Sequence, residues 1–418
     1  MKLQTLSEQQ VLITFVALSL LLLFAYIFGT LLEKIKGPRV VGEIVGGMIL
    51  GGSCLFLLFP DFMKNIFFAY PEEGQVLNIF YQLGLIFLMF LSGYNTELKI
   101  DKENSKIISL VFIGATIFPM LLSIPFSNLF RQYFIGTVNN NIAFTLVFCI
   151  GVAITSIPVI SKIFFDMGIM NTKFSNTILT VATFQDLCLW ILLNIATCIS
   201  TTGEIKLSRM IAIVTTTIGL FVLITIFSRK VKPLKKELDT KLFYVISFIL
   251  LFLVCGLISK LGINIMYSAF LVGYIIKAIF GNDKKTKEKI SSLENIIFAF
   301  FVPVYFALVG IQLNIIHDFS LIRFIIFFII AFGLEFIGTW TTLLLTKISN
   351  NTRMNFAITM NARGGPGIVL ATVTYAANII NLEFFTILIL TTMLSSMIAG
   401  YYLRYQQKKN TKIFDSLT

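Results

Sequence analysis

The chain alternates between long apolar runs and short connections that carry most of its charge. Each run is about 20 residues long, which is the length that a helix needs to cross a bilayer. The strands of a membrane barrel would instead show short segments of alternating apolar and polar residues. The pattern therefore predicts an all-α polytopic membrane protein. We expect thirteen spans, at roughly 11–33, 38–59, 76–96, 107–130, 141–165, 174–200, 207–228, 241–259, 262–281, 293–311, 319–346, 354–378 and 382–403.

Composition agrees with this class of protein. The 418 residues are 57% hydrophobic and 13% charged, whereas soluble domains carry roughly 25% charged residues. The net charge of +12 does not indicate a nucleic-acid partner, because the basic residues lie between apolar runs and form no basic face with interleaved aromatics. The five cysteines fall inside predicted spans without metal-ligand spacing, so we expect reduced core residues.

The distribution of lysine and arginine predicts an orientation. With the N-terminus outside, most of the 33 basic residues fall in segments on the inner side, as the positive-inside rule requires. The C-terminus is then cytoplasmic. The short loops favour the inner membrane of a bacterium, although an organelle membrane is an alternative.

Two helix breaks indicate an internal repeat. The basic segment Arg229–Lys241 divides the chain into two halves of similar size, and interruptions fall at 151–158 in the fifth span and at 363–367 in the twelfth. These spans lie seven apart and therefore run in opposite directions, which predicts two inverted repeats with the breaks as partners. The broken-helix residues are Pro158, Gly364, Gly365 and Pro366.

Asp186 is the strongest candidate for chemistry. It lies near the middle of a predicted span, on a polar stripe with Thr180 and Thr183. A carboxylate at membrane depth is costly and normally serves ions or protons; the plain alternative is a satisfied contact between helices. We expect Asp186 to hold a proton or a cation, and Gln185, about 100° away on the helix, to bond across to a broken helix.

The remaining polar residues within spans have two interpretations each. Thr155 and Ser156 lie in the first break and add hydroxyl oxygens that suit monovalent cations, so we expect them to ligate or orient the ion. Glu335 is either a second carrier or the ion-pair partner of Arg363. We expect Arg363 to balance charge where the two broken helices cross. Glu43 is expected to make a structural or gating contact.

Enzyme chemistry has little support in the sequence. His317 is the single histidine, and no HExxH arrangement or nucleotide-binding glycine loop is present. We therefore predict no resident metal, no cofactor and no catalytic residues.

Six stretches together resemble the second large branch of the monovalent cation:proton antiporter superfamily. They are Gly37–Gly51, Leu83–Gly93, Ala153–Ile160, Phe184–Asp186, Val302–Gly310 and Asn361–Gly365. The Gln185-Asp186 pair is similar to the potassium-efflux type. Many members carry a lysine on the span that here holds Glu335, so the charge at that place is reversed.

The resemblance implies that different groups of spans have different roles. Residues 107–200 and 319–403 would form the ion-transport core, 1–96 and 241–311 a scaffold for a homodimer, and 207–228 a linker helix. The core would move like an elevator and expose Asp186 to each side in turn. The short tail 404–418 leads us to expect no nucleotide-binding domain in this chain.

These observations predict a secondary antiporter that exchanges Na⁺ or K⁺ for H⁺ across a bilayer, with Asp186 as the shared carrier. One alternative is a proton-coupled exporter of a small organic solute on the same fold. The other is a passive ion channel, which needs no titrating acid.

Overall fold

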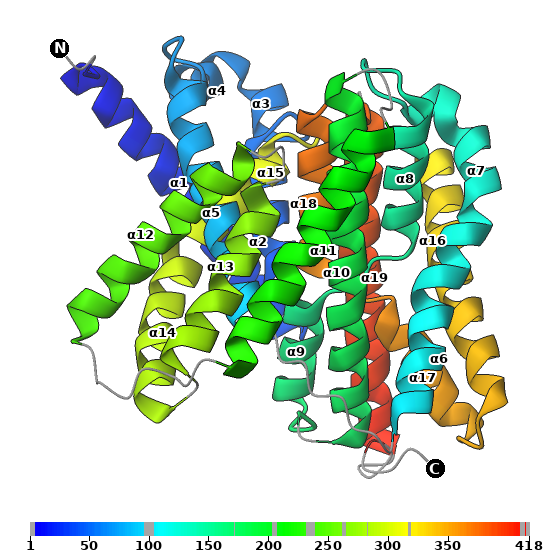
Figure 1. Cartoon of the computed structure of the whole chain (residues 1–418). Coiled ribbons are helices and arrows are strands. Elements are labelled where there is room, and N and C mark those ends of the chain that lie inside the picture. The colour runs from blue at the N-terminus through cyan, green and yellow to red at the C-terminus, as the bar shows by residue number, and fades with distance from the viewer. Residues whose placement is uncertain are drawn as a thin grey trace. The chain divides into compact units, whose positions relative to one another are not determined.

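The computed structural model describes residues 5–95, 104–170, 172–202, 207–230, 239–260, 265–281, 283–316, 319–409 and 414. Within these ranges the chain is helical (Figure 1), and strand-type pairing is limited to an isolated bridge between Ile135 and Ile380. Ten of the described helical segments are long and apolar enough to cross a membrane. The predicted all-α polytopic class is confirmed.

Other helices lie where the remaining spans were expected. They are the 24-residue helix α11 (Leu207–Lys230), the shorter apolar helix α13 (Ile265–Phe280), and the pair α17 (Asn350–Met360) and α18 (Gly364–Ala376). The number of thirteen spans and the inverted repeat stay predictions.

The helices form two compact units. The first consists of Met1–Asn95, Ile224–Ser259 and Ile265–Asp318, and the second of Thr96–Leu223, Lys260–Asn264 and Phe319–Thr418. The boundary between them falls inside α11. The transport role predicted for residues of the second unit, and the dimerisation role predicted for residues of the first, stay predictions.

The first unit is built around the glycine-rich helix α2. A Cβ atom at Gly42 would overlap the Phe28 carbonyl of α1, and one at Gly47 would overlap the Ala307 carbonyl of α15. Only glycine allows two backbones to approach α2 so closely. Besides α13, the helices of this unit are α1 (Glu8–Lys34), α2 (Arg39–Leu50), α3 (Leu55–Leu58), α4 (Pro60–Phe67), α5 (Glu73–Asn95), α12 (Thr240–Ser259), α14 (Lys284–Ile296), η3 (Ile297–Phe301) and α15 (Val302–Ile311).

The second unit has an aromatic core that joins helices far apart in the sequence. The ring of Phe174 lies 4.7 Å from that of Phe356 and 5.2 Å from that of Phe414, measured between centroids. Besides α17 and α18, its helices are α6 (Ser105–Phe112), η2 (Ile113–Ile117), α7 (Phe118–Phe134), α8 (Asn141–Val152), α9 (Ile157–Asp166), α10 (Lys173–Thr202), α16 (Leu321–Thr342), η4 (Leu343–Leu345) and α19 (Leu382–Lys409).

Both predicted breaks are present, and they meet. Helix α8 ends at Val152 and α9 begins at Ile157, while α17 ends at Met360 and α18 begins at Gly364. The main-chain nitrogen of Ser156 in the first break donates to the carbonyl of Ala362 in the second, at 2.7 Å. One unwound segment therefore supplies a backbone partner for the other.

The residues predicted to break the helices lie just beyond the unwound segments. Pro158 is in the first turn of α9, and Gly364, Gly365 and Pro366 open α18. The unwound residues are 153–156 and 361–363. A first-turn N–H has no partner within its own helix, so proline is favourable there. Proline and glycine thus mark where each second half-helix begins.

Gly364 generates a prediction about the crossing. Its φ is +41°, and a Cβ atom there would overlap the side chains of Val159 and Ser156. Gly364→Ala should therefore lower the stability of the purified protein, through backbone strain of about 1–3 kcal/mol and steric overlap. The measurement is thermal unfolding in detergent.

The matched control for this prediction is Gly333→Ala on α16. A Cβ atom there meets nothing within 4 Å, and alanine favours a helix over glycine by roughly 1 kcal/mol. The control should unfold at the wild-type temperature or above it. Equal unfolding temperatures for Gly364→Ala and Gly333→Ala would contradict the close packing of the two breaks.

Candidate functional site

The crossing of the two breaks gathers buried polar side chains of the second unit. They come from both breaks and from the flanking helices α10 and α16. Each is at most 1% exposed: Thr155, Ser156, Gln185, Glu335, Asn361 and Arg363. We call these six residues the crossing cluster.

Arg363 and Glu335 form a buried ion pair in this cluster. An Nη2–Oε2 distance of 2.8 Å joins them, and their side chains are 1% and 0% exposed. The same nitrogen donates to the carbonyl of Val152 at 2.9 Å. Val152 ends α8, so a positive group lies at the negative end of that half-helix, where it is favourable. Of the two interpretations of Glu335, the structure contains the ion pair.

The hydroxyls of the first break have partners within the protein. Thr155 Oγ1 lies 2.6 Å from the carbonyl oxygen of Met360 and 3.2 Å from Oε1 of Glu335. Ser156 Oγ accepts a hydrogen bond from the main-chain nitrogen of Val159 and so caps α9. Both hydroxyls therefore help to hold the half-helices in place.

Gln185 fastens α10 to two other segments. Its Nε2 donates to the carbonyl of Ala153 in the first break at 2.6 Å, and to the carbonyl of Ala115 in η2 at 3.3 Å. The predicted bond from Gln185 to a broken helix is confirmed. With its amide nitrogen used in this way, Gln185 fixes the position of its neighbour on the chain.

That neighbour, Asp186, adds a carboxyl to a region in which Gln185 Oε1 and Arg363 Nε and Nη1 are also buried without a hydrogen-bond partner. It is 3% exposed, and its Oδ1 is buried without a hydrogen-bond partner. The threonines beside it on α10 donate to their own helix: Thr180 to the carbonyl of Asn176, and Thr183 to that of Leu179. A buried acceptor without a donor is uncommon, and a bound ion, proton or water is the usual explanation.

Glu43 does not belong to the crossing cluster. It lies in the first unit, where Nε of Arg39 donates to its Oε1 at 2.9 Å, one helical turn away on α2. Arg39 also lies 3.7 Å from Glu33. Glu43 thus makes a local ion pair, and a gating role for it stays a prediction.

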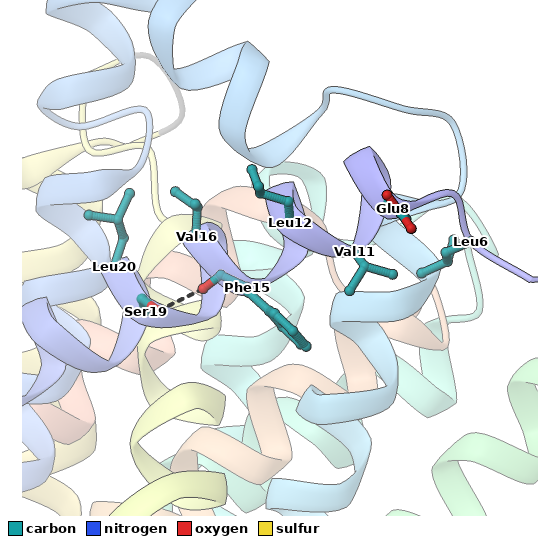
Figure 2. Close-up of a pocket in the computed structure, with 8 residues that line it drawn as sticks. All are labelled: Leu6, Glu8, Val11, Leu12, Phe15, Val16, Ser19 and Leu20. Atoms are coloured by element: carbon teal, nitrogen blue, oxygen red, sulfur yellow. Dashed lines mark hydrogen bonds between the residues drawn. The ribbon is translucent and has the colours of Figure 1, made fainter.

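A hollow on the first unit has a different character from the crossing cluster (Figure 2). Apolar side chains of α1 such as Leu12, Phe15 and Val16 line it, and the hydroxyl of Ser19 donates to the Phe15 carbonyl. Glu8 is the acidic residue among those drawn there. Such a surface suits acyl chains or apolar side chains rather than a cation.

Across the part of the chain that the structure describes, no group of three or more His, Cys, Asp or Glu side chains is arranged to hold a metal ion. His317 lies outside the described residues.

The sequence matches the family described as sodium/hydrogen exchanger, transmembrane, over residues 19–405. The chain belongs to this exchanger family. It is therefore a multi-pass membrane protein, in agreement with its apolar helices.

Relatives in the exchanger family include bacterial and plant proteins. The chain is 25% identical to the Na⁺/H⁺ antiporter NhaS4 of Synechocystis, with 90% of this chain and 92% of that protein aligned. It is 22% identical to the Na⁺/H⁺ antiporter of Enterococcus hirae, with 94% of this chain and 98% of that protein aligned. Identity to cation/H⁺ antiporter 18 of Arabidopsis thaliana is 26%, over 88% of this chain and 46% of that longer protein.

A solved structure shares the fold of this exchanger-family chain. It is the sodium proton antiporter MjNhaP1 from Methanocaldococcus jannaschii at pH 8, with a TM-score of 0.61. The likeness covers 96% of this chain and 97% of MjNhaP1, at 16% sequence identity. At that identity the likeness establishes the fold alone.

Two members of the site were not found from the sequence. The Ala115 carbonyl accepts from Gln185, and Pro119, four residues on, has no N–H to offer it. The proline was visible in the sequence, although its partner across the unit was not. Asn361, whose Oδ1 lies 3.3 Å from the guanidinium of Arg363, appeared only within the stretch that carries the family resemblance.

The buried ion pair generates a second prediction. Arg363→Met leaves the Glu335 carboxylate buried without its counter-charge, which should lower the free energy of unfolding by about 3–5 kcal/mol. Glu335→Met should cost a similar amount. The double variant should lose much less than the sum, as measured in a double-mutant cycle of detergent unfolding.

The control cycle uses Arg323 and Glu383 in the same unit. These side chains lie 2.7 Å apart but are 35% and 15% exposed, so their coupling should be about 0–1 kcal/mol. If losses at Arg363 and Glu335 simply add, the two charges do not depend on each other.

Proposed function

We propose that this chain is a secondary antiporter that exchanges a monovalent cation, Na⁺ or K⁺, for H⁺, with Asp186 binding each in turn. The observation that carries the proposal is the Asp186 carboxyl itself. It is buried on α10, and its Oδ1 lacks a hydrogen-bond donor.

Burial makes binding at Asp186 competitive. An ionised carboxylate at membrane depth needs a compensating charge. The buried guanidinium of Arg363 is already paired with Glu335, so it does not fill this role. A proton or a cation can neutralise Asp186, but one excludes the other. This competition is the minimum requirement for exchange.

The neighbouring residues support a carrier at this place. Gln185 anchors α10 to the first break through the Ala153 carbonyl, which holds Asp186 beside the crossing. The hydroxyls of Thr155 and Ser156, expected from the sequence to ligate the ion, already have partners within the protein. The proposal therefore rests on Asp186 as carrier, with Gln185, Thr155 and Ser156 shaping its surroundings.

The proposal extends to the cycle and its setting. The second unit would move relative to the membrane and expose Asp186 to each side alternately, in a homodimer with outside N-termini in a bacterial inner membrane. The names of the relatives favour Na⁺, while the Gln185-Asp186 pair favours K⁺ by resemblance.

Exchange at a single carboxyl would be electroneutral. One proton replaces one cation on Asp186, so no net charge crosses. The membrane potential, worth about 2.3 kcal/mol per charge per 100 mV, would then not drive the cycle. A carrier role for Glu335 would change this stoichiometry.

Substitution of Asp186 tests the proposal. Asp186→Asn should abolish cation-driven proton movement, because an amide can neither release a proton nor balance a cation. The measurement uses purified protein in proteoliposomes with a pH-sensitive dye inside, Na⁺ or K⁺ added outside, and the potential clamped.

Cys188→Ala is the matched control, two residues further along the same helix and partly buried. It should exchange at the wild-type rate. Exchange by Asp186→Asn at the wild-type rate would overturn the proposal. Uncoupled cation flux that survives in Asp186→Asn would instead indicate a channel.

A further inference from the structure

The end of α16 and the start of α17 form a corner with a mixed surface. The apolar span that contains α16 runs from Leu321 to Leu345, and α17 begins at Asn350. In η4, Leu343 is fully buried, whereas Leu344 and Leu345 are 47% and 68% exposed. Leucines that face outward at the end of a span suit contact with acyl chains.

Two basic side chains follow these leucines in the sequence. Lys347 is exposed, and Arg353 lies in the first turn of α17. The Nη2 atom of Arg353 donates to the carbonyl of Thr346 at 3.3 Å. Because this carbonyl belongs to the peptide that joins Thr346 to Lys347, the bond holds the guanidinium beside the backbone of Lys347. Both cations therefore belong to one short stretch of surface.

Neither cation is neutralised by the protein. Among the residues that the structure describes, no ion pair involves Lys347 or Arg353, and Nε of Arg353 has no hydrogen-bond partner. A guanidinium carries five N–H donors in a planar fork that fits the oxygens of a phosphate. The bond to Thr346 uses one of these donors. The partly exposed side chain of Arg353 can therefore also bind an anionic group.

Trp340 borders the corner on the side of α16. Its Nε1 atom donates to Oδ1 of Asn350, the first residue of α17, at 3.2 Å. The indole is partly exposed. Tryptophan, which has an apolar ring and one polar edge, is enriched at the headgroup level of bilayers. The corner thus combines apolar, interfacial and cationic groups.

We propose that this corner, formed by Trp340, Leu344, Leu345, Lys347 and Arg353, is a binding site for an anionic phospholipid. The phosphate binds Lys347 and Arg353, and the acyl chains contact Leu344 and Leu345. The N-terminus of α17 adds partial positive charge on the side of the phosphate. We call these five residues the lipid corner.

The combination of charge and apolar surface identifies this occupant. A free phosphate ion would use the two cations but not the leucines, and a lipid without net charge would gain less from the cations. With the orientation proposed above, the lipid corner faces the cytoplasmic leaflet, where anionic lipids attract basic residues. Each basic residue favours such binding by about fivefold, so two favour it by about thirtyfold.

The test uses the fluorescence of Trp340. The chain has two tryptophans, and the other, Trp190 of α10, is 5% exposed. The full protein is reconstituted in phosphatidylcholine bilayers that contain a small fraction of phosphatidylglycerol, with a nitroxide quencher near the glycerol end of one acyl chain. Trp340→Phe supplies the signal of Trp190, which is subtracted.

Labelled phosphatidylglycerol should quench Trp340 more strongly than equally labelled phosphatidylcholine. The ratio of the two binding constants should be on the order of thirty. Unlabelled phosphatidylglycerol should reverse the quenching, and inorganic phosphate at the same concentration should not. Equal quenching by the two labelled lipids, or reversal by inorganic phosphate, would overturn the proposal.

Variants of the two cations test the role of charge. Lys347→Gln should lower the preference for phosphatidylglycerol by about fivefold, and Lys347→Gln with Arg353→Gln should abolish it. Arg353→Lys keeps the charge and should keep most of the preference. Thermal unfolding in detergent checks that each variant is folded. If Arg353→Gln does not fold, Lys347→Gln decides alone, and an unchanged preference in it would contradict the site.

Lys408→Gln with Lys409→Gln is the matched control. These two exposed lysines end α19 in the same unit, so the control removes the same charge and should keep the wild-type preference. Equal losses in the control and in the double variant of the lipid corner would indicate attraction by overall charge and reject a site. Asp186→Asn should bind the lipid as the wild type does, so this result is independent of the proposed antiport.

Discussion

The crossing is shaped by the hydrogen-bonding needs of two helices that stop inside an apolar environment. Each break exposes main-chain groups that lipid cannot satisfy. The structure satisfies them across the break: Ser156 meets Ala362, Arg363 meets Val152, and Gln185 meets Ala153. The two breaks thus bond to each other, and each also bonds to a neighbouring helix, the first to α10 and the second to α16.

Of the two buried acids in this region, Glu335 is paired with Arg363, whereas Asp186 has no ion-pair partner among the residues that the structure describes. Arg363 enters because the second break places it at the end of α8, and Glu335 balances it. Many members of the family that this chain resembles carry a lysine on the span that here holds Glu335. In this chain the negative charge of Glu335 balances Arg363. Two adjacent residues of α10 have different contacts. Gln185 bonds the helix to the first break, whereas Oδ1 of Asp186 has no hydrogen-bond donor.

The sequence predicted those features that depend on one helix at a time. Apolar length predicted the all-α class, and Pro158 and Gly364 located both breaks to within a few residues. The contacts of Thr155 could not be predicted, because Met360 and Glu335 are 205 and 180 residues away. The spacing of residues in the sequence shows which of them share one face of a helix, but not which other helix packs against that face. The grouping of helices into a core and a scaffold came from the family resemblance, because periodicity alone cannot give it, and it stays a prediction.

The two π-helices affect which way the residues that follow them face. Both η2 and η3 end one residue before an X-Pro pair, Phe118-Pro119 and Val302-Pro303. A π-turn accommodates one more residue than an α-turn. Removing a single residue from 113–117 would tighten η2 into ordinary helix and rotate everything after it by about 100°. The Ala115 carbonyl and the segment that follows it would then change their relative orientation, so the hydrogen bond between Ala115 and Gln185 depends on one inserted residue in η2.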